Sequence, residues 1–129
     1  MKKCKIFIAC DTASPKILTK IIKQSKTNKL KIGYKIGLEF FLSPKGRSFI
    51  AKQKKEEIFL DLKLNDIPNT CAAAVYSMKD LKNISYLTVH INGGFEMLKA
   101  IKKATKKHNR NISPIYTKCR CRYIRLLRQ

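Results

Sequence analysis

Short apolar runs alternate with segments of helical periodicity along most of the chain. The apolar runs return about every 27 residues, a period that suits one strand followed by one helix. They are rich in isoleucine, valine, phenylalanine and tyrosine, as buried strands are. The pattern predicts strands over Lys5–Cys10, Lys31–Ile36, Ile58–Leu62 and Tyr86–His90, with a weaker fifth strand over Asn111–Tyr116.

A helix-start signal follows each of the first four predicted strands. Ser14-Pro15 combines an N-cap residue with a proline in the first turn. The other starts are Ser43-Pro44, Pro68 and Gly93-Gly94. Apolar positions then recur on one helical face: Ile17, Leu18, Ile21 and Ile22; Phe49 and Ile50; Ala72, Ala73, Val75, Tyr76 and Met78; Phe95, Met97, Leu98 and Ile101. This alternation predicts parallel βαβ units.

The polar residues suited to chemistry fall at the carboxyl ends of the predicted strands: Asp11, Lys35, Asp61, Lys63 and His90. Doubly wound sheets and (β/α) barrels both place their functional site at that end. The first strand is followed by Asp11-Thr12-Ala13-Ser14 in place of a glycine-rich phosphate loop, which favours the barrel. With 129 residues, the chain supplies about four βα units and a partial fifth strand. The predicted fold is therefore α/β, the N-terminal half of a (β/α)8 TIM barrel.

The formal net charge of +21 raises the question of nucleic-acid binding. The basic residues of segment 1–109 are all lysines except Arg47, and they spread over nearly every polar stretch. A binding patch more often clusters, with arginine and exposed aromatic residues among the lysines. We expect no specific nucleic-acid partner, only nonspecific attraction of polyanions at low salt.

Cysteine spacing and hydropathy argue against a disulfide-rich, metal-binding or membrane protein. Five cysteines at irregular positions do not form a disulfide framework. Cys119-Arg120-Cys121 has the wrong spacing for a zinc knuckle, so we expect no metal. No run approaches the roughly 20 apolar residues of a membrane span. Ile6–Ala9 is too short for a signal-peptide core, and the expected location is cytoplasmic with no membrane contact.

Residues 61–70 carry the densest chemical signal in the chain. Asp61 and Lys63 point the same way on a strand, because side chains repeat every two residues. Asp66 falls in the loop that leaves this strand. Burying charged groups together is costly unless they are paired, so such groups often mark a functional site. The structural alternative is an ion pair at a strand end and a loop aspartate that starts a helix.

Four segments, one of which contains residues 61–70, match the motifs of a known family: Ile8–Asp11, Lys35–Phe41, Phe59–Thr70 and Thr88–Gly94. In order and spacing, residues 4–108 resemble orotidine 5′-phosphate decarboxylase. The Asp-x-Lys-x-x-Asp pattern alone would also fit sugar-phosphate decarboxylases of the same superfamily, which require a metal. The sequence Ile67-Pro68-Asn69-Thr70 favours the orotidylate branch.

The resemblance implies decarboxylation of orotidine 5′-phosphate (OMP) to UMP in pyrimidine biosynthesis, without a cofactor. Lys35, Asp61, Lys63 and Asp66 would form the catalytic network. Lys63 would give the proton to C6 of the base, and Asp61 would lie beside the departing carboxylate.

The resemblance also implies how substrate is held. Asp11 and Lys35 would bind the ribose hydroxyls. The resemblance implies a homodimer whose active sites are shared between the two subunits. Asp66 and Thr70 would then contact the ligand bound in the neighbouring subunit. His90 would be a structural or supporting residue.

Residues 110–129 differ from the rest of the chain. They hold five of the six arginines and two of the five cysteines, with one lysine and no acid. We therefore divide the chain into a partial barrel, 1–109, and a basic tail outside the family, 110–129, with disorder of the tail left open. A truncated or frameshifted copy is our hypothesis, and a tail for RNA or membrane contact is the rival.

The family's phosphate-binding loops would follow after this point. Activity of the chain would then depend on the assembly of two half-barrels or on a separately encoded C-terminal half. The alternatives are an inactive fragment or a basic protein that binds polyanions nonspecifically.

Overall fold

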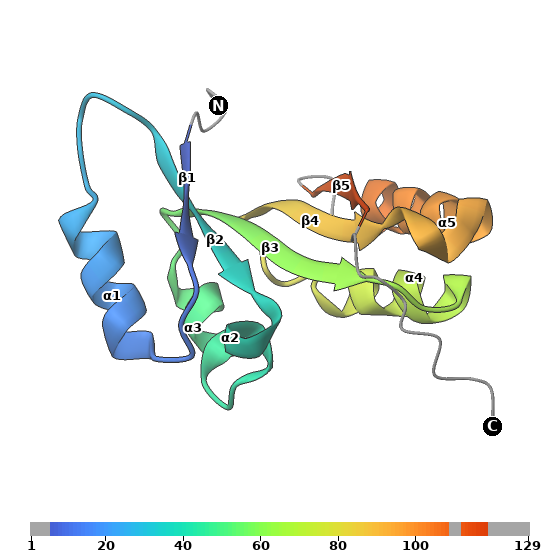
Figure 1. The fold of residues 1–129 in the computed structure, drawn as a ribbon, viewed down its shortest axis with the longest axis horizontal. Helices are drawn as coiled ribbons and strands as arrows, with labels where there is room; N and C mark the ends of the chain where they lie inside the picture. Colours follow the sequence, from blue (N-terminus) through green and yellow to red (C-terminus); the bar gives the residue numbers. More distant parts are fainter. Residues whose placement is uncertain (1–5, 109–111, 119–129) are drawn as a thin grey trace.

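Five parallel strands form one sheet in the order of the sequence (Figure 1). The computed structural model describes residues 6–108 and 112–118. The strands are β1 (Ile6–Cys10), β2 (Ile32–Gly37), β3 (Glu57–Leu64), β4 (Ile84–His90) and β5 (Ser113–Thr117). All neighbouring pairs are parallel. The predicted parallel α/β class is thus confirmed.

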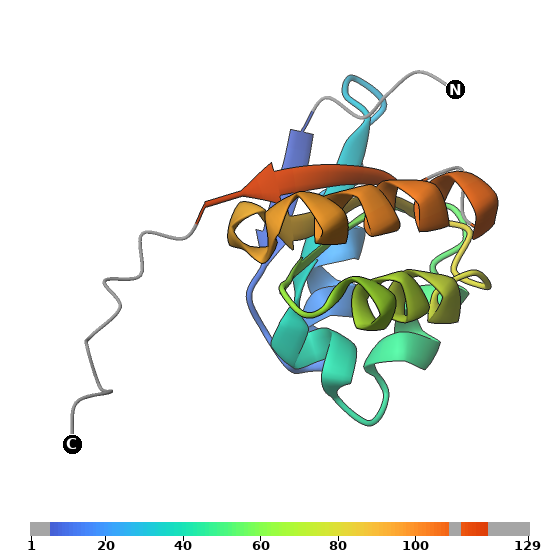
Figure 2. The same cartoon turned by 90° about the vertical axis from the view of Figure 1, so that its right-hand side faces the viewer.

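Helices connect the strands, as predicted for βαβ units. They are α1 (Pro15–Gln24), α2 (Leu38–Leu42), α3 (Gly46–Lys52), α4 (Pro68–Ser77) and α5 (Gly94–His108), with a 3₁₀ turn η1 (Ile91–Gly93) before α5. Ser14 caps α1 by accepting a hydrogen bond from the Ile17 amide at 3.5 Å. Pro68 occupies the first turn of α4. Helices α4 and α5 pack side by side beyond β4 (Figure 2).

The helix predicted after Ser43-Pro44 is present as α3, which carries Phe49 and Ile50 and begins at Gly46. The short helix α2 before it was not predicted, and the Ser-Pro pair lies in the turn between the two helices. Ser43 is extended, with ψ 154°, because a following proline disfavours the helical region for the residue before it. The chain then turns tightly back: a Cβ on Gly46 would lie 1.7 Å from the Phe40 carbonyl oxygen, which only glycine avoids.

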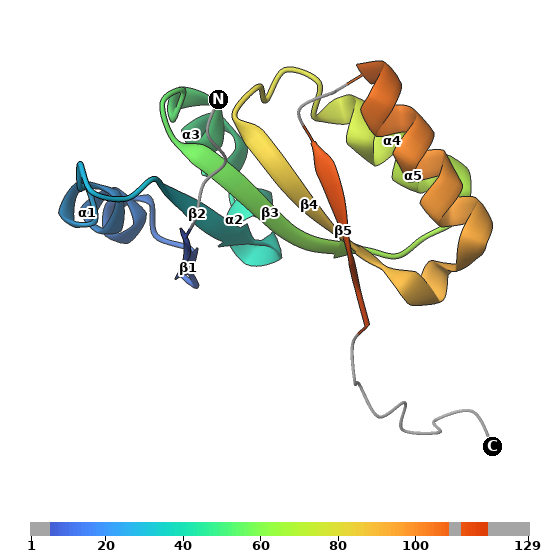
Figure 3. The ribbon, with the colours of Figure 1, turned by 90° about the horizontal axis from the view of Figure 1, so that it is seen from above.

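The two faces of the sheet have different surroundings. On β3, Ile58, Leu60 and Leu62 are buried, and they belong to the core shared with the helices. Phe59 and Asp61 alternate with them on the other face and are only partly buried. Figure 3 shows α1 at the β1–β2 end of the curved sheet and α4 and α5 at the β4–β5 end.

The face opposite the core carries an aromatic cluster of Phe7, Phe59 and Tyr86. Their rings meet edge to face, with centroids 5.4–5.8 Å apart. Gly33 of β2 makes room for this contact, since a Cβ there would lie 2.5 Å from the Phe7 ring. The cluster begins a second apolar layer on the face where a closed barrel has its interior.

The sheet has β1 and β5 at its edges. Strand β5 lies within segment 110–129, which the sequence analysis separates as a tail. Residues 110, 111 and 119–129 of that segment, which include Cys119 and Cys121, lie outside the described residues.

Leu60 offers a test of the core. It is fully buried at the centre of β3, so Leu60→Ala is expected to lower the free energy of unfolding by about 2–5 kcal/mol. Leu30→Ala, at a position 45% exposed, is the matched control and should cost far less. Urea denaturation compares the two variants. Equal losses would mean that Leu60 is not part of a packed core.

Candidate active site at the carboxyl end of strand β3

A bulge near the end of β3 sets the geometry of the site. Leu60 pairs with Leu87 and Leu64 with Val89, so β3 advances four residues where β4 advances two. Within the bulge, Lys63 has a positive φ of 49°, which is uncommon for a residue with a side chain. Bulges often occur beside active sites, where they redirect a side chain. The side chains of Asp61 and Lys63 are in contact, as the two-residue repeat predicts, although the strand between Leu60 and Leu64 is irregular.

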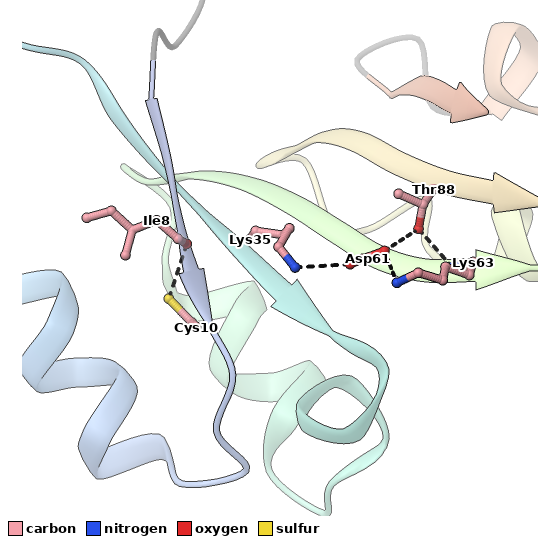
Figure 4. A network of polar contacts seen from close by, with 6 residues as sticks. All are labelled: Ile8, Cys10, Lys35, Asp61, Lys63 and Thr88. Atoms are coloured by element: carbon pink, nitrogen blue, oxygen red, sulfur yellow. Dashed lines mark hydrogen bonds and ion pairs between the residues drawn. The ribbon is translucent and has the colours of Figure 1, made fainter. Parts of the chain in front are cut away.

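Asp61 lies at the centre of a polar network (Figure 4). Its Oδ2 accepts a hydrogen bond from Lys35 Nζ of β2 at 3.0 Å. Its Oδ1 accepts one from Lys63 Nζ at 2.8 Å and one from the Thr88 hydroxyl of β4 at 2.8 Å. Three neighbouring strands therefore position one carboxylate.

Opposing effects set the pKa of Asp61. Burial alone would raise it, but hydrogen bonds from Lys63, Lys35 and Thr88 outweigh burial and lower the pKa to about 2. The carboxylate is therefore ionised at neutral pH. Two ammonium groups share this one carboxylate, so the cluster carries a net positive charge and can attract an anionic ligand.

The Asp61 pKa predicts a pH effect on stability. Because the folded-state pKa lies below the unfolded value of about 3.9, ionised Asp61 stabilises the fold above pH 4. That contribution should disappear as the pH falls from about 4 to about 2. Urea midpoints of the wild type and Asp61→Asn, measured across this range, should converge at low pH. A constant difference would show that Asp61 does not titrate in this way.

The other predicted site residues lie apart from this network. Asp11, Asp66 and Thr70 are exposed. The Asp66 carboxylate accepts the Ile67 amide at 2.7 Å, and no hydrogen bond or ion pair within residues 6–108 and 112–118 joins it to Asp61 or Lys63. His90 is partly buried, and its Nδ1 is buried with no hydrogen-bond partner in the described structure. Within this chain, the structure therefore brings together Lys35, Asp61 and Lys63 of the predicted set.

Thr88 is the member that the sequence analysis missed. It belongs to a family-like segment, but a threonine in an apolar strand carries no chemical signal of its own. Its position on β4 next to β3, on the same face as Tyr86, could have indicated it. The contact with Asp61 follows from strand register, which the sequence pattern does not specify to within one residue.

Two free cysteines, Cys10 and Cys71, are buried within the described residues. Burial raises the pKa of the Cys10 thiol to about 11, with a further increase from Asp11 and an opposing effect from Lys35. Burial also raises the pKa of Cys71. Both thiols stay protonated at neutral pH, as inert buried cysteines do.

Residues 6–108 and 112–118 contain no group of three or more His, Cys, Asp or Glu side chains that could hold a metal ion. No helix in these ranges is both long and apolar enough to cross a membrane.

Comparison with known proteins connects this geometry to a family. The sequence model of the orotidine 5′-phosphate decarboxylase / HUMPS family matches residues 5–119. The chain belongs to this family. The match ends ten residues beyond the limit of 109 expected from the sequence, and it includes β5.

Curated relatives include orotidine 5′-phosphate decarboxylases of bacteria. The protein of Fusobacterium nucleatum is 42% identical over 106 residues, 81% of this chain and 43% of that protein. The protein of the Wolbachia of Brugia malayi is 45% identical over 107 residues, 78% of this chain and 45% of the relative. The chain spans about half the length of the curated relatives it matches.

Solved structures of the family share the fold. Orotidine 5′-phosphate decarboxylase from Lactobacillus acidophilus superposes with a TM-score of 0.75 at 29% identity, covering 88% of this chain and 52% of that one. The Methanocaldococcus jannaschii enzyme, in complex with the inhibitor BMP, gives 0.72 at 27% identity and covers 51% of that chain. The five-stranded sheet thus corresponds to about half of a TIM barrel of this decarboxylase family.

Proposed function

We propose that this chain contributes the charged half of an orotidine 5′-phosphate decarboxylase site. The observation that carries the proposal is the Asp61 carboxylate held between Lys35 and Lys63, at 3.0 and 2.8 Å. The names of the curated relatives support OMP as substrate and UMP as product. The reaction would then belong to pyrimidine biosynthesis in the cytoplasm.

The residue types suit a decarboxylation that needs no metal or organic cofactor. Loss of carbon dioxide builds negative charge at the ring carbon C6, and the Lys63 ammonium can stabilise that charge and then protonate the carbon. Its side chain is 48% exposed and accessible from the face opposite the core. Lys35, 28% exposed, holds Asp61 and would also reach a ribose hydroxyl, as Asp11 would.

Asp61 would act on the substrate carboxylate. Two like charges about 4 Å apart repel by roughly 4 kcal/mol at an effective dielectric near 20. Repulsion that is relieved as carbon dioxide leaves accelerates the reaction, since only differences between ground and transition state count. Even part of this energy corresponds to two to three powers of ten in rate.

The same end of the sheet carries an exposed apolar surface that supports a homodimer. Large apolar side chains that follow β2, β3 and β4 in the chain are exposed, and exposed apolar residues that gather in one region mark interaction sites: Leu38 47%, Leu42 70%, Ile67 65%, Ile91 39% and Phe95 74%. Asp66 and Thr70 lie in the same loop and helix start as Ile67, and both are exposed. In a dimer formed through this surface they would complete the partner's site.

Phe95 tests the dimer. Phe95→Asp places a charge in the proposed interface and should convert a dimer to a monomer in sedimentation equilibrium, with little effect on the free energy of unfolding of the monomer. Ile17→Asp, at an exposed position on α1, should leave the oligomeric state unchanged. If Phe95→Asp sediments as the wild type does, the interface lies elsewhere.

A complete site also requires the part of the barrel that the relatives have beyond the match. The edges of the described sheet, β1 and β5, and its aromatic face support pairing with such a second half. Phosphate binding remote from the reacting carbon commonly supplies transition-state affinity.

The test is a decarboxylation assay that follows the loss of OMP ultraviolet absorbance. The chain is assayed alone and after co-expression with the C-terminal half of the Fusobacterium nucleatum relative. We expect little turnover by the chain alone and restored turnover in the co-purified pair. A pair that co-purifies without turnover would instead identify the chain as an inactive remnant of the family.

A further inference from the structure

The Thr88 hydroxyl makes two hydrogen bonds to the bulge of β3. It donates to Asp61 Oδ1 at 2.8 Å and accepts from the Lys63 backbone amide at 2.8 Å. Thr88 is 3% exposed. We propose that Thr88 is a positioning residue, whose single hydroxyl fixes the Asp61 carboxylate and the backbone of Lys63 relative to each other.

The register explains why a hydroxyl is needed at this position. Thr88 lies between Leu87, which pairs with Leu60, and Val89, which pairs with Leu64. It therefore faces the segment of β3 whose residues have no regular partner. A backbone amide that is shielded from water and has no acceptor is costly, and for the Lys63 amide, which is partly buried, the Thr88 oxygen serves as the acceptor.

A hydroxyl group can make both of these hydrogen bonds at the same time. A threonine hydroxyl has one proton to donate and lone pairs to accept with. When its oxygen accepts from Lys63, its proton is directed to Asp61, so both groups are set by one atom. The other hydrogen-bond donors to Asp61 are long lysine side chains with many rotamers. The Thr88 side chain is short, is buried, and has a single rotatable bond that carbon branching restricts.

Positive φ at Lys63 makes this support more important. That conformation costs free energy for a residue with a Cβ and persists only where neighbours hold it. Without the Thr88 oxygen, the peptide could relax toward a regular strand, and the Lys63 ammonium would move with it. The consequence for turnover rests on the proposed function, whereas the geometry does not.

The test compares Thr88→Val, which keeps the shape and removes the hydroxyl, with Thr88→Ser, which keeps the hydroxyl. Thr105→Val is the matched control: Thr105 is also 3% exposed, and its hydroxyl donates within α5, to the Lys102 carbonyl. Carboxyl-carbon NMR of the full chain follows the titration of Asp61, and amide hydrogen exchange follows Lys63. Neither measurement depends on activity, so failure of the proposed function and failure of this inference remain distinguishable.

In Thr88→Val, the Asp61 titration should move up from about 2 toward the ordinary carboxyl range, and the Lys63 amide should exchange at least about tenfold faster. Thr88→Ser and Thr105→Val should keep the wild-type values. In the completed barrel, Thr88→Val should lower kcat about tenfold with KM little changed, and Thr88→Ser should restore it.

An Asp61 titration in Thr88→Val that matches the wild type would overturn the proposal. If Thr88→Val does not fold, the wild-type chain and Thr88→Ser still decide: an unprotected Lys63 amide in either would contradict the bond to the Thr88 oxygen.

Discussion

Lys63→Ala is expected to abolish decarboxylation of OMP by the completed barrel, with kcat lower by roughly 10³-fold or more. The variant removes the proposed proton donor together with the positive charge that would stabilise the developing carbanion. Positioned proton transfer contributes about 10²–10⁴-fold, and fixed electrostatic groups contribute a comparable factor. The side chain is 48% exposed, so its removal leaves no core cavity, and alanine keeps the Cβ that the positive φ already accommodates.

Two further variants isolate the cause of the loss. Lys63→Arg keeps the charge, but guanidinium does not release its proton near neutral pH, so this variant should also be inactive. Lys20→Ala removes an exposed lysine of α1 far from β3 in sequence and should retain full activity. The ultraviolet assay of OMP measures all three. Substantial turnover by Lys63→Ala would exclude Lys63 as the proton donor and shift that role to another group.

Asp61→Asn is expected to have the second largest effect, a loss in kcat of at least about 10²-fold. The amide has no charge to balance Lys35 and Lys63, which bond to the two oxygens of the present carboxylate. Without a carboxylate between them, the two ammonium groups repel each other and would separate. The separation removes Lys63 from the position that the reaction requires.

In Asp61→Asn, the affinity for an anionic ligand should not fall together with kcat. Because Asp61→Asn removes a negative charge from the site, an anionic substrate or product should bind as well as before or more tightly. UMP binding by calorimetry, measured beside kcat, tests this separation. Asp80→Asn, which weakens an exposed ion pair with Arg47, is the control and should change neither value. A parallel loss of UMP affinity and kcat in Asp61→Asn would mean that Asp61 serves to bind ligand.

Much of the fold was predictable because it depends on local patterns. The period of strand and helix, together with proline and glycine at the helix starts, predicted the strands, four of the five helices and the parallel order. The exception is α2, and α3 begins slightly later than the Ser43-Pro44 signal predicted. There the Ser43-Pro44 signal competes with a short helix that begins directly after β2, and the close approach of Gly46 to Phe40 determines where the chain turns.

The candidate site was predictable only in part. Asp61 and Lys63 are close in sequence, and the resemblance to the family assigned Lys35, which lies 26 residues from Asp61. Asp11, Asp66 and Thr70 keep their proposed roles in substrate binding or across a dimer, and within the described chain they are exposed. Thr88 carried no signal, because a hydroxyl becomes informative only when its neighbours across the sheet are known.

The sequence by itself determined the class of the fold, the family and the pairing of Asp61 with Lys63 on β3, since periodicity and short motifs are local properties of the chain. The tertiary structure alone decided the register of β3 against β4, the bulge with positive φ at Lys63, and the contact of Thr88 with both neighbours. The physical reason is that register depends on packing and hydrogen bonding between strands more than 20 residues apart. Those interactions have no counterpart in the local pattern of apolar and polar residues.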